Sequence, residues 1–327
     1  MTENAWSPCA NMETLKLRAQ FLHKIRQFFM EREIMEVETP CLSHGTVTDV
    51  HLDAFSTNFD FDLSGEVKSL YLQTSPEYAM KRLLAAGSGA IFQICKAFRH
   101  EAAGHLHNPE FTMLEWYRPG FDDHELMVEL DELIQSLLNT PTALKLSYQQ
   151  AFIDKLSLDP LTISTIELRK RISELSKDNW LQNEDKDTLL QWLFSCHIEP
   201  TLGQNGEDWM PCFVYDFPAT QSSLAKINKK DPRVAHRFEL YYKGTELANG
   251  FYELQEAGEQ LTRFEKDNRI RQSQGKSKRP IDQNLIAALR SGLPDCAGVA
   301  LGVDRLFMLA TEQQHIKDVI SFDYTRC

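Results

Sequence analysis

Two dense runs of mixed polar and apolar residues, far apart in the chain, constrain its fold more than any other feature. The first reads FRHE at residues 98–101 and continues as HNPEFTMLE at residues 107–115. The second reads GVALGVDRL at residues 298–306. Each run places an arginine, Arg99 or Arg305, where strand-like sequence gives way to a loop or a helix. A fold that suits this chain must present both arginines from ordered elements.

The remaining sequence predicts an α+β fold with an antiparallel sheet flanked by helices, because strands mostly follow strands and the helices stand apart from them. Helical periodicity predicts a first helix at about 12–31, followed by a strand at 35–40 that a proline ends. Further strands are expected at about 71–74, 91–99, 111–117, 237–243 and 249–254 and near residue 299. Further helices are expected at 77–86, 122–138, 259–271 and 282–290. We expect one domain, 1–327, with a less regular insertion at about 140–205.

The charge balance bears on the partners of the protein. The formal net charge is −12, which opposes extended contact with the phosphates of a nucleic acid. The one obvious basic run, at residues 275–279, is either a local phosphate-binding patch or a solvated loop. Seven scattered cysteines without a CxxC pair favour a reducing compartment. No apolar stretch is long enough for a membrane span. We therefore expect a cytoplasmic protein without a membrane partner.

The segment after the first arginine carries an unusual acid. In a strand, residues two apart share a face, so Phe111, Met113, Glu115 and Tyr117 are expected to point together. A buried glutamate is rare unless it is paired. A wet ligand-binding face explains the pattern, and an exposed sheet face is the alternative.

The two runs resemble motifs 2 and 3 of the class II aminoacyl-tRNA synthetases, and residues 15–40 resemble motif 1. The resemblance implies a class II catalytic core that joins an amino acid to the α-phosphate of ATP, and a homodimer formed through motif 1. A helix that packs only on its own core is the alternative to the dimer. Arg99 and Arg305 would be the catalytic residues, since arginine binds phosphate oxygens without losing its charge. The implied ATP-binding residues are Arg99, His100, Glu101, His107, Asn108, Phe111, Glu246, Leu247, Gly302 and Arg305.

The string ELANGFYEL at residues 246–254 resembles the signature of the lysyl-tRNA synthetases. That resemblance implies that Glu239 and Glu246 hold Mg²⁺ against the ATP phosphates, as hard oxygen ligands do. Three acids, Glu77, Glu115 and Glu253, favour a substrate with amino groups, which means lysine or a close isomer. The implied substrate-binding residues are Ser75, Pro76, Glu77, Glu115, Tyr117, Asn249, Phe251, Glu253 and Ala300.

Two departures from the synthetases point to a truncated paralogue, the kind that attaches lysine to translation elongation factor P. The first expected helix begins near residue 12, so we expect no N-terminal anticodon-binding barrel. Ala300 also stands where lysyl-tRNA synthetases carry glycine, and one methyl group changes discrimination by about 1–3 kcal/mol. The resemblance therefore implies (R)-β-lysine as substrate, a lysine ε-amine of elongation factor P as acceptor, and tRNA as an unlikely partner. A small lysyl-tRNA synthetase and a non-catalytic lysine sensor remain as alternatives.

Overall fold

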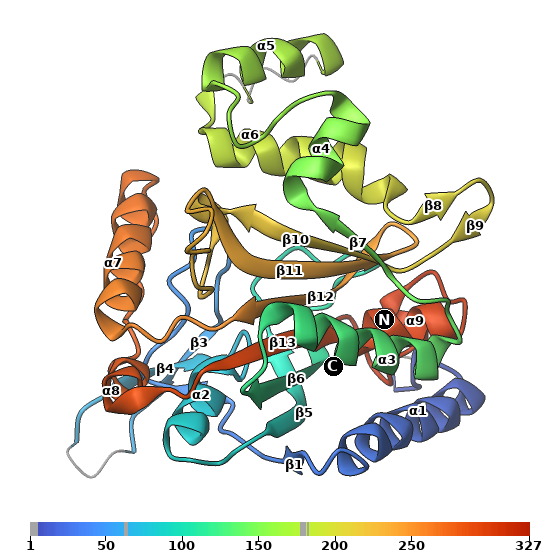
Figure 1. Ribbon diagram of the computed structural model, residues 1–327. Helices are drawn as coiled ribbons and strands as arrows, with labels where there is room; N and C mark the ends of the chain where they lie inside the picture. Colours follow the sequence, from blue (N-terminus) through green and yellow to red (C-terminus); the bar gives the residue numbers. More distant parts are fainter. Residues whose placement is uncertain (1–5, 62–64, 177–180, 182) are drawn as a thin grey trace. The chain divides into compact units, whose positions relative to one another are not determined.

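A computed structural model describes residues 6–61, 65–176, 181 and 183–327 (Figure 1). The chain forms two compact units. Unit 1 contains residues 1–122 and 253–327, and unit 2 contains residues 123–252. No described helix is both long enough and apolar enough to cross a membrane. The division of the chain into domains stays a prediction.

Unit 1 begins with helix α1 (Met12–Met30), in agreement with the sequence. The side chain of Asn11 caps it by accepting a hydrogen bond from the backbone N–H of Thr14 at 2.8 Å. The apolar face of α1 buries Phe29, whose ring stacks on Phe92 with centroids 4.5 Å apart and meets Trp116 edge-on at 5.3 Å. These aromatic contacts pack α1 against β5 (Ile91–Phe98) and β6 (Glu110–Pro119), the strands that carry the motif 2 run.

The main sheet of unit 1 holds strands β1 (Met35–Glu36), β5 (Ile91–Phe98), β6 (Glu110–Pro119) and β13 (Cys296–Gly302), in the order β1-β5-β6-β13. Pairs β5–β6 and β6–β13 are antiparallel, as predicted, but β1 runs parallel to β5. A parallel pair needs a long connection. Residues 37–90 supply it, and they contain a second sheet that the sequence analysis mostly missed: β2 (Leu42–Ser43), β4 (Lys68–Leu72) and β3 (Ser56–Phe59).

The described residues of unit 1 also form helices α2 (Glu77–Ala85), α7 (Ala257–Ser273), α8 (Gln283–Gly292) and α9 (Val303–Ala310), with a short 3₁₀ turn at Ile316–Asp318. Helix α2 begins at the predicted residue, Glu77. Pro76 is the N-cap residue and not the first helical residue, and the hydroxyl of Ser75 accepts from the backbone N–H of Glu77 at 3.1 Å. Ser75 therefore serves the first N–H group of this helix.

Unit 2 holds strands β12 (Thr245–Tyr252), β11 (Val234–Tyr242), β10 (Cys212–Pro218) and β7 (Leu144–Ser147), in that spatial order. Pairs β10–β11 and β11–β12 are antiparallel, and β7 lies parallel to β10. Strand β10 was missed in the sequence analysis, although it is a mostly apolar run between two prolines. Helix α3 (Asp123–Leu138) confirms the prediction for that range.

Residues 140–205 are mostly helical where the structure describes them. They form α4 (Tyr148–Leu156), α5 (Thr165–Leu175) and α6 (Lys186–Leu193), a π-helical turn (Phe194–Ile198), a 3₁₀ turn (Glu199–Thr201), and β8 (Gln204–Asn205), which pairs with β9 (Asp208–Trp209). Another 3₁₀ turn, Ala219–Gln221, follows β10. Tyr148 stacks on Phe194 at 5.3 Å and lies 4.9 Å from Phe217. The helices thus share a buried apolar cluster with β10.

Candidate active site

Arg99 directly follows β5 and lies beside an aromatic ring of the neighbouring strand. Its guanidinium carbon is 5.2 Å from the centroid of the Phe111 ring, and its backbone N–H donates to Pro109 O at 2.9 Å. No acceptor in the described part of the chain reaches the buried Nε of Arg99. The guanidinium of Arg99 lies next to an aromatic ring and has an N–H group without a protein acceptor. This arrangement suits a ligand that carries an anionic group beside a planar ring.

Arg305 and His107 lie together, although they are distant in sequence. The Nη2 of Arg305, in the first turn of α9, is 2.7 Å from Nε2 of His107. Burial and the neighbouring charges of Arg305 and Arg99 lower the pKa of His107 to about 4. The imidazole is therefore neutral at neutral pH and accepts the hydrogen bond of Arg305. His107 therefore orients the second arginine in the protein without its ligands.

A buried ion pair fixes the start of α9 to the other two motifs. Asp304 accepts from Nη2 of Arg18 at 2.5 Å and from the backbone N–H of Thr112 at 2.7 Å. Arg18 also donates to Thr112 Oγ1 at 3.0 Å. Helix α1, strand β6 and helix α9 are thereby joined one residue away from Arg305. Arg18 was not predicted from the sequence, because nothing in its own helix marks it as different from a surface arginine.

The loop between the two halves of the motif 2 run is held by backbone and side-chain contacts. His100 and Glu101 are exposed, and the N–H of His100 donates to Asp53 O at 2.8 Å. Asn108 is buried, and its amide donates to Glu110 O at 2.6 Å and accepts from the N–H of Tyr324 at 3.1 Å. The side chain of Asn108 is therefore engaged within the protein and orders the loop.

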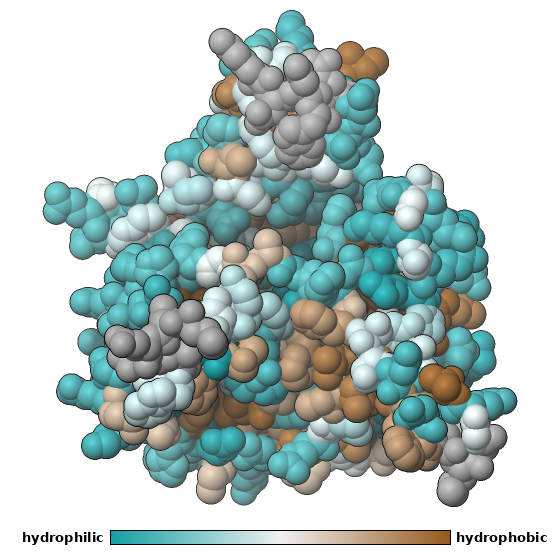
Figure 2. Space-filling model, turned by 180° about the vertical axis from the view of Figure 1, so that it is seen from behind, coloured by the Kyte–Doolittle hydropathy of each residue, from teal (hydrophilic) through white to brown (hydrophobic). Residues whose placement is uncertain are grey.

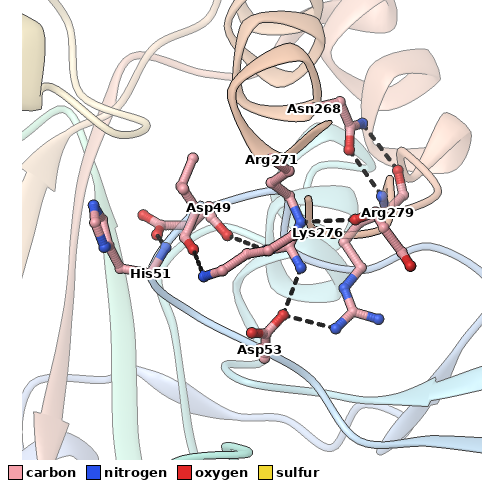
Figure 3. A network of polar contacts seen from close by, with 9 residues as sticks. Asp49, His51, Asp53, Asn268, Arg271, Lys276 and Arg279 are labelled. Atoms are coloured by element: carbon pink, nitrogen blue, oxygen red, sulfur yellow. Dashed lines mark hydrogen bonds and ion pairs between the residues drawn. The ribbon is translucent and has the colours of Figure 1, made fainter. Parts of the chain in front are cut away.

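The basic run after α7 is partly internal and is not a fully solvated loop. Arg271 and Arg279 both donate to Asp53 Oδ1, at 2.5 and 2.7 Å, and Lys276 donates to Val50 O at 2.6 Å (Figure 3). Burial opposes the ionisation of Asp53, but the two arginines outweigh it and lower its pKa to about 2. Since the carbonyl of Asp53 holds the N–H of His100, this network supports the loop beside Arg99.

Glu115 on β6 is buried and fully hydrogen-bonded. Its Oε2 accepts from the hydroxyl of Ser75 at 2.7 Å and its Oε1 from that of Tyr117 at 2.7 Å. Only 2% of Glu115 is exposed, so the exposed sheet face was wrong for this residue, and its place on a ligand-binding face stays a prediction. Burial and the nearby charge of Glu77 raise the pKa of Glu115. Glu115 and Tyr117 nevertheless share a side, as the alternation predicted.

Two more acids of the predicted set meet at a buried lysine. The ammonium of Lys81 lies 2.6 Å from Glu77 Oε1 and 2.6 Å from Glu253 Oε2. Lys81 and Glu253 are each 1% exposed. Burial raises the pKa of Glu253, although Lys81 opposes that rise. Lys81 was not predicted from the sequence. Its only signal is a position four residues after Glu77, where a helix brings opposite charges together.

Strand β13 closes this cluster on the other side of β6. Its register places Ala300 opposite Glu115 and Gly298 opposite Tyr117. A β-carbon at Gly298 would lie 2.3 Å from the Tyr117 ring and 2.6 Å from Glu253 Oε1, so only glycine fits there. Gly302 ends the strand and is the N-cap of α9.

The other predicted residues lie on β11 and β12 of unit 2. Glu239 accepts from Arg237 at 2.5 Å and from the hydroxyl of Tyr241. The register sets Asn249 opposite Glu239, and Glu246 opposite Tyr241. Phe251 is half-buried and Leu247 is buried. No donor in the described part of the chain reaches Asn249 Oδ1, which leaves that atom available to a ligand.

The carboxylates of unit 2 suit a metal that arrives with its substrate. Glu239 and Glu246 share a face of the β11–β12 ladder, since Tyr241 lies two residues after Glu239 and opposite Glu246. No group of three or more possible His, Cys, Asp or Glu ligands occurs among the described residues. Mg²⁺ needs only one or two protein carboxylates when substrate phosphates complete its shell. The residues present therefore fit a phosphate-bound magnesium ion.

Comparison with known proteins places the chain in a family. Residues 8–326 match the family described as tRNA synthetases class II (D, K and N), so the chain belongs to that family. Similar proteins named elongation factor P–(R)-β-lysine ligase occur in Pseudoalteromonas translucida, at 57% identity over 100% of both chains, and in Vibrio cholerae, at 54% over 100% of both. A protein of the same name in Salmonella typhi is 53% identical, again over 100% of both chains.

Proposed function

We propose that this protein activates a lysine isomer with ATP and transfers it to the ε-amine of a lysine on translation elongation factor P. One observation carries the proposal. Unit 1 holds both a phosphate-seeking arginine, Arg99, and a buried cluster of acids that suits a substrate with amino groups. The choice of (R)-β-lysine as the isomer and of elongation factor P as the acceptor rests on the names of the relatives given above.

In the first step the carboxylate of the amino acid attacks the α-phosphorus of ATP, and pyrophosphate leaves. Arg99 stabilises the negative charge that builds at the α-phosphate. The ring of Phe111, next to Arg99, stacks on the adenine. Arg305, held by neutral His107, binds on the other side of the nucleotide. Mg²⁺, held by Glu239 and Glu246, supplies positive charge to the phosphates when bound.

In the second step a neutral lysine amine of elongation factor P attacks the carbonyl carbon of the aminoacyl-adenylate, and AMP leaves. This reaction needs mainly that the amine be held against the mixed anhydride, and positioning supplies much of such a rate. Ala300 would set the choice of isomer, since its methyl group lies on the strand position opposite Glu115.

We also propose a cytoplasmic homodimer formed through the motif 1 segment. Apolar side chains gather on the lower half of the face drawn in Figure 2. Met30 and Met35 in this segment, and Leu42 just after it, are exposed at 70%, 49% and 44%. Exposed apolar side chains so close in sequence suit a protein interface. Sedimentation of wild type and of Met30→Glu/Met35→Glu tests this, and a monomeric wild type would contradict it.

The activity is tested by incubating the protein with ATP, Mg²⁺ and labelled (R)-β-lysine or α-lysine. Elongation factor P or total tRNA serves as acceptor. We expect lysine-dependent exchange of pyrophosphate into ATP and label on the protein factor. Label on tRNA alone would instead support a small lysyl-tRNA synthetase. If neither isomer increases the exchange of pyrophosphate into ATP, the result would instead support a non-catalytic lysine sensor.

A further inference from the structure

A buried ammonium group lies among the acids of the proposed amino-acid site. Lys81 on α2 contacts Glu77 and Glu253 at 2.6 Å each and is only 1% exposed. The third acid, Glu115, is linked to this cluster through Ser75. The hydroxyl of Ser75 donates to Glu115 and accepts from the backbone N–H of Glu77. All these residues belong to unit 1. A buried cation with two carboxylate partners is costly unless its charge is needed there.

We propose that Lys81 is a positioning residue that sets the charge of this cluster to match a substrate with two ammonium groups. This inference rests on the proposed function. When substrate is bound and all three carboxylates are ionised, they and the ammonium of Lys81 together carry two negative charges. A lysine isomer carries two ammonium groups, and its carboxylate loses its charge when it joins the phosphate. Without Lys81 the cluster would hold one negative charge too many and would take up a proton in place of substrate charge.

The other titratable groups near the cluster do not change this balance. Tyr117 on β6 faces Glu115, and Tyr78 on α2 lies near Glu77. Burial raises the pKa of both phenols well above the ordinary value. Burial and the charge of Glu115 raise the pKa of the Cys95 thiol on β5 to about 12. All three side chains are neutral near pH 7, and β13 contributes only Gly298 and Ala300 here. The charge is therefore set by three glutamates and Lys81.

Lys81 also lowers the pH at which the acids become ionised for substrate binding. Burial and mutual repulsion favour protonated carboxyl groups, and a nearby cation opposes both effects. Lys81 acts in this way on Glu253, whose pKa is raised mainly by burial and lowered again by the lysine. The acids can then lose their protons to meet the substrate amines at a lower pH than they could without Lys81. The rising limb of kcat/KM against pH reports this directly.

The test measures kcat/KM for (R)-β-lysine and α-lysine in pyrophosphate exchange between pH 5.5 and 9.5. Lys81→Met should shift the midpoint of the rising limb upward by about one pH unit or more, as expected for uncompensated buried carboxylates. Lys81→Arg should keep the wild-type midpoint, because it keeps the charge. Lys170→Met, an exposed lysine on α5, is the matched control and should shift nothing.

A charge-balanced pair of variants keeps the test valid if Lys81→Met does not fold. Glu77→Gln/Lys81→Met retains two negative charges and should return the midpoint to the wild-type value, even if the rate falls. Glu77→Gln alone leaves one negative charge, and its midpoint should lie below that of the double variant. Equal midpoints in these two variants, or in Lys81→Met and wild type, would overturn the role of Lys81. Wild-type protein without lysine-dependent exchange would overturn the proposed function instead.

Discussion

Replacing Glu253 by glutamine removes one charge and almost no volume from the buried cluster, so it isolates the contribution of that charge. The side chain is 1% exposed and its ion pair with Lys81 spans 2.6 Å. A hydrogen bond to a charged group contributes about 1.5–3 kcal/mol. We therefore expect Glu253→Gln to lower kcat/KM for the lysine isomer about ten- to 150-fold.

The same substitution should not weaken the fold in proportion. Burial raises the pKa of Glu253 from 4.5 to about 8. A carboxyl group with a raised folded pKa binds a proton that the unfolded chain releases, so stability falls as pH rises from about 4.5 through 8. Glutamine has no such proton. We expect the unfolding temperature of Glu253→Gln to depend less on pH over this window than that of wild type.

The assay combines pyrophosphate exchange with thermal unfolding at several pH values. Glu174→Gln is the matched control, because Glu174 is 51% exposed and pairs with Arg171 three residues earlier on α5. It should leave both exchange and the pH dependence of stability unchanged. Exchange by Glu253→Gln within twofold of wild type would refute the view that this carboxylate meets a substrate cation.

Three further predictions follow from named contacts. Ala300→Gly should move the ratio of kcat/KM toward α-lysine by about ten- to 200-fold, and an unchanged ratio would place the choice of isomer elsewhere. Asp53→Asn should raise the KM for ATP more than that for the amino acid, because it loosens the support of the loop beside Arg99; Asp231→Asn, at a half-buried aspartate paired with an arginine, should change neither KM. Arg18→Met leaves Asp304 buried without its cation and should cost about 3–5 kcal/mol of stability by denaturant unfolding; a loss below 1 kcal/mol would show that Arg18 is dispensable.

Most of the fold of each unit could be predicted because long periodic segments dominate it. Helix α1 and strand β5 were predicted to within one residue, since their apolar spacing or continuous apolar run is long. The short strands β2 and β3 were missed because two to four residues carry no periodicity. The parallel pairs were also missed, since strand direction depends on where the connecting chain returns.

Individual site residues could be predicted only where the residue type and its motif together indicate one main function. Arg99 and Arg305 stood out because arginines in such motifs suit phosphate. Arg18 and Lys81 were missed because their partners, Asp304 and Glu253, are distant in sequence and meet them only in the folded chain. Basic residues that serve a site through another residue look like ordinary surface charges until the fold supplies their partners.

Asp53 shows the same limit for an apparent patch. Five residues rich in lysine and arginine, at 275–279, are typical of a phosphate-binding loop or a solvated turn. In the folded chain two of their charged side chains turn inward, Arg279 to the carboxylate of Asp53 and Lys276 to a backbone carbonyl. Because a buried or half-buried cation seeks the nearest acceptor, the use of a charge depends on what the fold brings beside it. Charge runs can therefore be found from sequence, whereas their partners require the structure.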